Sequence, residues 1–204
     1  MNLRRFRALL QRTLTDPRGA GAEVIAMGWP MQGLWIALML IAVLLSLIVS
    51  ALLRVAELPA DAMGDMLRAS PAYRAPLLFA LINWIQAVIS VLILNWSARI
   101  LGGRGNLGDI LAVMIWLEIV SVVLSLGLFV IGLIVPVIGA YAVLAMFVWG
   151  IWATIGLIDA AGRFDNMFRA AGVCVVAAVT ASVVMMLLSA LIGSLMGGLV
   201  TRGG

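Results

Sequence analysis

The sequence predicts an all-α membrane protein: a polytopic bundle of five transmembrane helices, preceded by amphipathic interfacial helices at the N-terminus. Of its 204 residues, 65% are apolar in a count without glycine, whereas soluble domains reach about 45–50% with glycine included. Charged residues make up 11%, against about 25% in soluble domains. A surface of this composition cannot be wetted, which excludes a soluble enzyme, a disordered chain and a coiled coil.

Residues 1–33 are predicted to form a cytoplasmic amphipathic segment. Asp16 suits the N-cap of a second short helix in this segment, with Pro17 at its first position. Before it, apolar side chains recur at helical spacing among arginines, as in helices that lie in the headgroup layer. We therefore expect the arginines to contact anionic headgroups; the alternative is that both helices pack on the cytoplasmic face of the bundle. The apolar residues are Leu3, Phe6, Leu10 and Leu14, and the arginines are Arg4, Arg5, Arg7 and Arg12.

Residues 34–201 are predicted to form the transmembrane domain, because a spanning helix needs about 20 apolar residues. The only charge from Ile110 to Ile158 is Glu118. As one helix this stretch would measure roughly 74 Å, more than twice the hydrocarbon thickness of roughly 30 Å. It must fold back, and Pro136 marks the break because proline cannot donate to a helix. The expected spans are about 34–53, 76–97, 110–131, 138–158 and 171–196.

The arginines also predict the orientation. All thirteen basic residues are arginine; nine lie before the first span and in the loops after the second and fourth spans, and four lie on the other side. The positive-inside bias places the N-terminus in the cytoplasm and the C-terminus in the periplasm. Arginine usage, with abundant alanine and glycine, favours a bacterial protein, so we expect the cytoplasmic (inner) membrane of a bacterium.

Polar side chains inside the bilayer are expensive, so their positions are informative. In each of two neighbouring spans they form a narrow stripe, within about 60° at 100° per residue. Glu118 and Ser90 both lie roughly 13 Å from the nearest loop charge along their helices. We therefore expect Glu118 to face Ser90 and Gln86. The predicted cluster consists of Asn83, Gln86 and Ser90 in the second span and Glu118, Ser121 and Ser125 in the third.

Two hypotheses explain this cluster. One is a polar path with an ion-coupling carboxylate; the other is a hydrogen-bonded clamp between the two helices. A single carboxylate without a buried basic partner, metal ligands or broken half-helices favours the clamp. In the first span, Ala42, Ser46 and Ser50 form a stripe of small residues that suits close packing of helices.

The sequence offers no catalytic, cofactor or metal residues. It has no histidine, which removes the Ser-His-Asp triad, histidine-ligated haem and most zinc sites. The lone Cys174 lies in an apolar run and is expected to be a small core residue. The glycine-rich turn at residues 102–106 lacks the lysine and hydroxyl of a phosphate-binding loop. A tight cytoplasmic turn, with Asp109 capping the third span, explains it better.

Several short motifs resemble the Yip1 family. The run ARILGGRGNLGDILAVMIWLEIV (Ala98 to Val120) is similar to its small-residue turn before the third span, TDPRGA (Thr15 to Ala20) to its proline-containing N-terminal segment, and Arg169-Ala170 to the start of its fifth span. The resemblance implies a five-span bundle with a cytoplasmic N-terminus. Eukaryotic members are associated with vesicle trafficking, membrane shaping and binding of Rab-type GTPases. This chain lacks the DLYGP-type motif of many of those members, so GTPase binding is not carried over.

These observations favour a non-enzymatic integral membrane protein that acts through lipid or protein contacts in membrane organisation. The alternative is a small transporter or channel with a polar path at Glu118. The expected partners are membrane lipids, with anionic headgroups at the cytoplasmic face, and a membrane protein or a second copy of the chain. No nucleic acid and no cofactor is expected.

Overall fold

The computed structural model describes residues 3–200; for Leu133, Pro136, Ala140 and residues 188–200 it describes the backbone alone. Within that part, five helices are long and apolar enough to cross a membrane. They are α3 (Met31–Val55), α6 (Pro76–Ile100), α7 (Leu107–Ile134), α8 (Pro136–Gly162) and α9 (Met167–Val200). The shorter helices are α1 (Leu3–Thr15), α2 (Pro17–Ala26), α4 (Ala62–Ala69) and α5 (Pro71–Arg74). The predicted all-α polytopic bundle is confirmed.

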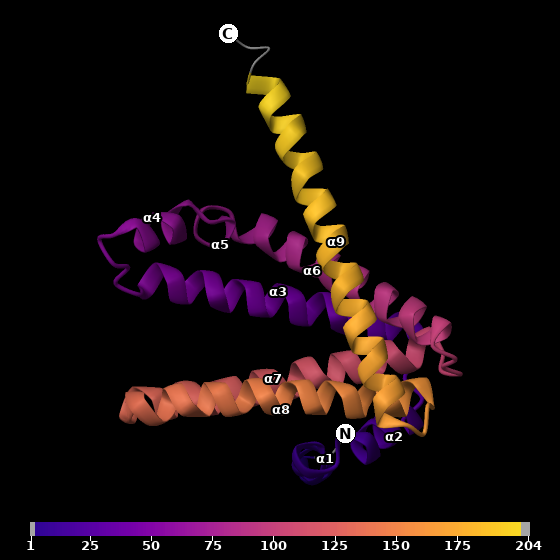
Figure 1. The fold of residues 1–204 in the computed structure, drawn as a ribbon. Coiled ribbons are helices and arrows are strands. Elements are labelled where there is room, and N and C mark those ends of the chain that lie inside the picture. Colours follow the sequence, from indigo (N-terminus) through magenta and orange to yellow (C-terminus); the bar gives the residue numbers. More distant parts are fainter. Residues whose placement is uncertain (1–2, 201–204) are drawn as a thin grey trace.

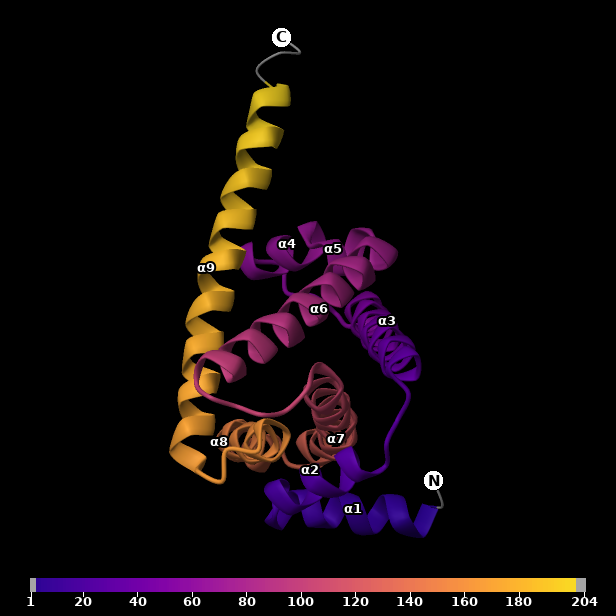
Figure 2. The ribbon, with the colours of Figure 1, turned by 90° about the vertical axis from the view of Figure 1, so that its right-hand side faces the viewer.

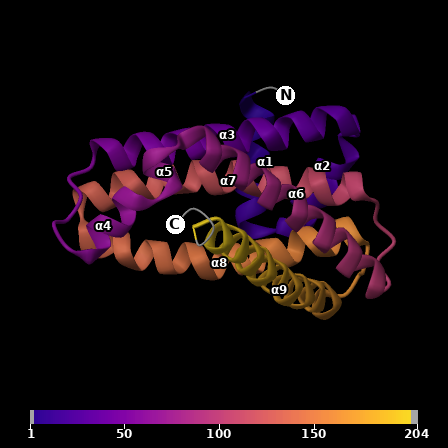
Figure 3. The same ribbon diagram turned by 90° about the horizontal axis from the view of Figure 1, so that it is seen from above.

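The five long helices form two antiparallel pairs and one oblique helix. Figure 1 shows the pair α3 and α6 above the pair α7 and α8, with α4 and α5 joining α3 to α6 at one end. The helices α1 and α2 lie against α7 and α8 near the opposite end. Seen from above, α9 crosses α8 at an angle (Figure 3), and it packs against both α6 and α8.

The turn between α7 and α8 consists of Val135 alone, since α7 ends at Ile134 and α8 begins at Pro136. Proline is well suited to the first position of a helix, where no backbone donor is needed. Two glycines bring the backbones together beside the turn: a Cβ added at Gly139 would lie 2.7 Å from the Gly132 Cα. The fold-back near Pro136 is thus confirmed.

The buried core lies toward the end of the bundle that carries α1 and α2. Its largest fully buried apolar side chains come from α1, the second half of α6, the first half of α7, the last part of α8 and the start of α9: Leu9, Val91, Ile110, Leu111, Val113, Val120, Leu157, Ile158 and Val173. Near the α7–α8 turn, by contrast, large apolar side chains such as Ile134 and Tyr141 are exposed. The far half of the hairpin therefore presents its apolar surface to lipid.

The segments rich in arginine meet at the core end. The Arg104 N–H donates to the Gly162 carbonyl at 2.9 Å, which joins the α6–α7 loop to the end of α8. A Cβ at Gly105 would collide with the Ala161 carbonyl, so only glycine permits this contact. Arg18 of α2 pairs with Asp159 at 3.1 Å. The structure thus brings the N-terminal segment and the loops after α6 and α8 together at one end.

Two predicted helix caps can be compared with the structure. Asp16 is the N-cap of α2, and its Oδ1 accepts from the Gly19 N–H at 2.9 Å, as predicted. Asp109 also caps α7, as predicted, but as the third residue of a capping box whose N-cap is Asn106. The Asn106 side chain accepts from the Asp109 N–H at 2.8 Å, and Asp109 accepts from the Asn106 N–H at 3.2 Å. At this third position a carboxylate is favourable because it accepts a hydrogen bond from the backbone N–H of the N-cap residue.

Candidate functional site

A cleft of about 340 Å³ lies between α3, α6 and α7. Most of its lining is apolar, from Leu38, Ile41, Leu45 and Val49 of α3, Phe79 and Val91 of α6 and Met114 of α7. Its polar lining comes from Ser46 on α3, from Asn83, Gln86 and Ser90 on α6, and from Glu118 on α7. Four of the six residues of the predicted intramembrane cluster therefore line one cavity.

The other two residues of the cluster lie elsewhere. Ser121 lines another cleft, of about 480 Å³, together with Thr154 of α8 and Cys174 of α9. Ser125 is exposed and lines neither cavity. The stripe on α7 is split because Ser121 lies 60° around the helix from Glu118, which is enough to bring it to the neighbouring pair of helices.

The hydrogen bond between spans in this region joins α6 to α3. Asn83 Nδ2 donates to Ser46 Oγ at 2.9 Å, and Ser46 in turn donates to the Ala42 carbonyl one turn earlier at 2.7 Å. Ser46 has 1% of its surface exposed. Sequence reasoning assigned Ser46 to a packing stripe, and its only signal was the four-residue spacing from Ala42 and Ser50.

Glu118 is partly buried and faces the same cleft as Gln86 and Ser90. Among the described residues, no side chain makes a hydrogen bond or ion pair with its carboxyl group, and no basic side chain lines the cleft. The clamp suggested by the sequence would need a hydrogen bond from α7 to α6. The structure instead leaves this carboxyl group open to the cavity.

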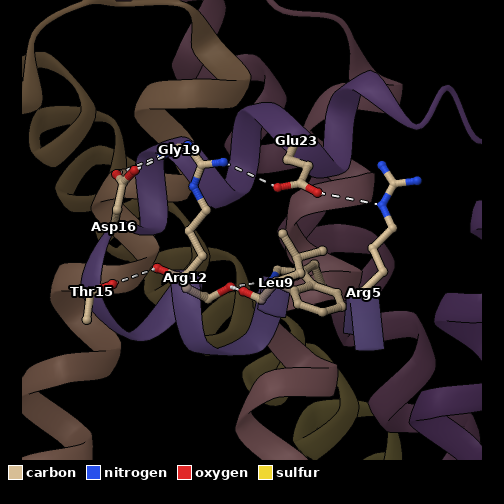
Figure 4. Close-up of polar contacts among 9 residues, drawn as sticks. Arg5, Leu9, Arg12, Thr15, Asp16, Gly19 and Glu23 are labelled. Carbon is tan, nitrogen blue, oxygen red and sulfur yellow. Dashed lines mark hydrogen bonds and ion pairs between the residues drawn. The ribbon is translucent and has the colours of Figure 1, made fainter. Parts of the chain in front are cut away.

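The four N-terminal arginines differ in their contacts. Figure 4 shows Arg5 and Arg12 of α1 reaching the same side chain, Glu23 of α2. Arg12 Nη1 lies 3.3 Å from Glu23 Oε2, and Arg5 Nε lies 3.7 Å from Oε1. Arg12 also pairs with Asp16 at 3.6 Å. These ion pairs hold α1 and α2 together as a hairpin.

Arg4 and Arg7 are the other two predicted headgroup contacts. Both are exposed, and within residues 3–187 neither has an acidic partner. Their guanidinium groups are therefore free to bind an anion from outside the chain.

The opposite face of α1 packs against the flank of the α7–α8 hairpin. Thr13 Oγ1 accepts a hydrogen bond of 2.8 Å from Trp116 Nε1 and donates to the Leu9 carbonyl at 2.8 Å. The Phe6 ring meets the Trp116 ring edge to face, with centroids 5.7 Å apart. Trp149 Nε1 of α8 donates to the Leu14 carbonyl at 3.3 Å. Contacts from both helices of the hairpin fix the position of α1.

The helix α2 continues this contact along α8. A Cβ at Gly156 would lie 2.8 Å from Pro17 Cγ, and a Cβ at Gly21 would lie 3.0 Å from the Ala160 Cβ. Asp159 is 2% exposed and accepts from Arg18 and from the Asn166 N–H; Arg18 also pairs with Asp165. Close glycine contacts and the ion pair from Arg18 to the buried Asp159 thus hold α2 on the bundle.

No group of three metal-ligating side chains occurs in the part of the chain that the structure describes. Cys174 is partly buried and free.

Comparisons with known proteins give one match. The model of the Yip1 domain matches residues 12–188, which covers α2 through most of α9 as well as the end of α1. No curated protein and no solved structure matches the chain.

Proposed function

We propose that this chain, which belongs to the Yip1 family, is a non-enzymatic protein of the bacterial cytoplasmic membrane that acts through lipid or protein contacts in membrane organisation. The observation that carries the proposal is the position of α1, which packs on the flank of α7 and α8 while Arg4 and Arg7 remain exposed and unpaired by the described residues. The orientation that goes with it has the N-terminus in the cytoplasm and the C-terminus in the periplasm.

The depth of α1 supports contact with headgroups. The 28 residues of α7 measure about 42 Å, roughly 12 Å more than the hydrocarbon layer. If the α7–α8 turn lies at the far boundary of that layer, the near boundary falls roughly 12 Å from Leu107 along the helix. Trp116, which binds Thr13 of α1, lies about 14 Å from Leu107. On this account α1 lies at the level where anionic headgroups begin.

The test compares the thermal stability of the full chain in nanodiscs of neutral lipid and of anionic lipid. We expect anionic lipid to stabilise the wild type, because each arginine near an anionic surface contributes about 1 kcal/mol. Arg4→Gln combined with Arg7→Gln should remove about 2 kcal/mol of that gain, and added salt should weaken it in the wild type.

The matched control is Arg12→Gln on the same helix, whose guanidinium is already paired with Glu23 and Asp16 and which should keep more of the gain. An equal gain in the double variant and the wild type would contradict headgroup binding by α1.

A second candidate function is a small transporter or channel, favoured by the cleft in which Glu118, Gln86 and Ser90 face one another. The test is proton- or ion-coupled flux in proteoliposomes. Glu118→Gln should abolish the flux while leaving thermal stability almost unchanged, and Ser125→Ala on the same helix should not affect it. Flux that is equal in wild type and Glu118→Gln would exclude this function.

A further inference from the structure

The cleft between α3, α6 and α7 has an unusual distribution of charge. Its wall carries one ionisable group, Glu118, and no side chain that could balance the charge of a carboxylate there. Away from water a lone carboxyl group keeps its proton, or it ionises when a cation or several hydrogen-bond donors come to it. Within the described part of the chain no basic side chain lines the cleft, and no side chain donates a hydrogen bond to Glu118.

The groups around Glu118 define what could approach it. Gln86 and Ser90 are both able to accept a hydrogen bond or to turn a dipole toward a positive charge. The other polar side chains of the lining, Ser46 and Asn83, bond to each other. The remaining lining is aliphatic apart from the Met114 thioether and the Phe79 ring, whose face favours contact with a cation. The volume of about 340 Å³ lies in the range of pockets that hold compact organic molecules.

We propose that this cleft is a binding site for a lipophilic cation, a compact apolar molecule carrying a single positive charge. The cation's charge would lie against the Glu118 carboxylate, beside Gln86 and Ser90, and its apolar body against the aliphatic wall of α3 and α6. The inference shares its cavity with the second candidate function but does not require transport.

Charge complementarity favours this occupant over a lipid acyl chain. An acyl chain would fill the apolar part of the cleft but leave Glu118 without a partner. An anion would meet a carboxylate and no basic side chain. A cation both pairs with the carboxylate and buries apolar surface, so each part of the lining gains a contact.

The position of the cleft fits a ligand that enters from the membrane. Glu118 lies about 16 Å from the start of α7 along its axis, roughly 4 Å inside the near boundary of the hydrocarbon layer given above. The pair α3–α6 diverges from the pair α7–α8 toward the end that carries α4 and α5 (Figure 1). A molecule that partitions into the bilayer reaches this depth without crossing a polar layer of the protein.

The experiment is equilibrium dialysis of radiolabelled tetraphenylphosphonium against the purified full chain in detergent. The wild type should bind saturably, with one cation per chain. Glu118→Gln should raise the Kd by about tenfold or more, because it removes the opposite charge and keeps the shape. Glu118→Asp should retain most of the affinity, and Ser125→Ala, on the same helix but outside the cleft, should bind as the wild type does.

Competition identifies the occupant. Unlabelled tetraphenylphosphonium should displace the label, whereas neutral triphenylphosphine oxide should not. Displacement by the neutral compound, or equal affinity in wild type and Glu118→Gln, would show a merely apolar cavity and overturn the proposal. Absence of saturable binding, or native mass spectra in which a retained phospholipid occupies the cleft and is not released by the cation, would also overturn it.

The same preparations separate this inference from the proposed functions. Cation binding without flux in proteoliposomes would support the binding site and remove the transporter. A loss of the anionic-lipid effect of Arg4 and Arg7 would leave cation binding unchanged, because those arginines do not line the cleft.

Discussion

The hydrogen bond from Trp116 to Thr13 fixes α1 on the spanning helices, and its removal should be measurable. Thr13 has no exposed surface, so Thr13→Val would leave the indole N–H of Trp116 without its partner. We expect a loss of about 1–3 kcal/mol in the free energy of unfolding, measured by denaturation in detergent micelles. Thr15→Val is the control: Thr15 is exposed and bonds only to carbonyls of its own helix. Equal losses in both variants would contradict a specific role for Thr13.

The hydrogen bond between Asn83 and Ser46 should contribute as a pair. Asn83→Leu and Ser46→Ala should each cost on the order of 0.6–2 kcal/mol, the range found for hydrogen bonds between membrane helices. Because both variants break the same bond, the double variant should cost less than the sum of the two. Additive losses in a double-mutant cycle would show that the two side chains act independently.

Glu118→Leu distinguishes the open carboxyl group from the clamp. A clamp predicts a loss of about 0.6–2 kcal/mol. Since no described residue bonds to Glu118, we expect the free energy of unfolding to stay level or to rise. Thermal unfolding of Glu118→Leu beside Asn83→Leu, which does break a bond between helices, provides the comparison.

At the residue scale, the sequence predicted the polar neighbours of Glu118 but not the hydroxyl groups that bond between helices. The depth and angle of Glu118 along the helix predicted the approach to Gln86 and Ser90, and these residues do line one cleft. The roles of Ser46 and Thr13 were missed, because each hydroxyl bonds to a side chain on another helix, and the sequence does not show which residues of different helices meet. Thr13 follows Phe6 by seven residues and so shares its face, a signal present in the sequence but weak without knowledge of Trp116.

At the scale of the elements, the contact between α2 and α8 gives a sharp prediction. Gly156→Ala places a methyl group against the Pro17 ring, 2.8 Å from its Cγ, so the helices must separate. We expect the N-terminal hairpin to loosen, with faster hydrogen exchange in α1 and α2. Gly150→Ala in the same helix meets nothing within 4 Å and should leave the exchange unchanged. Unaltered exchange in Gly156→Ala would mean that α2 can shift without loss.

The positions of the helices were largely predictable, because they depend on the length and hydropathy of local segments and on prolines within them. The face of α1 that packs against the bundle was not predictable. Sequence periodicity shows that a helix is amphipathic, but protein and lipid are equally apolar neighbours for its apolar face. In the structure the side chains of α1 buried against the bundle are Leu9 and Thr13, neither of which belongs to the predicted apolar stripe, and Leu3 of that stripe remains 85% exposed.

For the whole molecule, the arginine bias predicts which end faces the cytoplasm. A reporter inserted at Gly103 should read as cytoplasmic, whereas one inserted at Ala60 or fused after Thr201, beyond the described residues, should read as external. Reporters at Gly103 and after Thr201 that read the same side would contradict the orientation and the odd number of spans together.

The one-residue turn at Val135 also has a consequence for biosynthesis. When α7 leaves the ribosome, the next residues belong to α8, and no polar segment separates the two. If the translocon released α7 alone into the bilayer, no polar loop would follow Ile134 to anchor the C-terminal end of α7 at the far membrane surface. The two helices must therefore enter the bilayer as one unit, already paired where Gly132 meets Gly139. A connection of a single residue thus makes two of the five membrane crossings a single event.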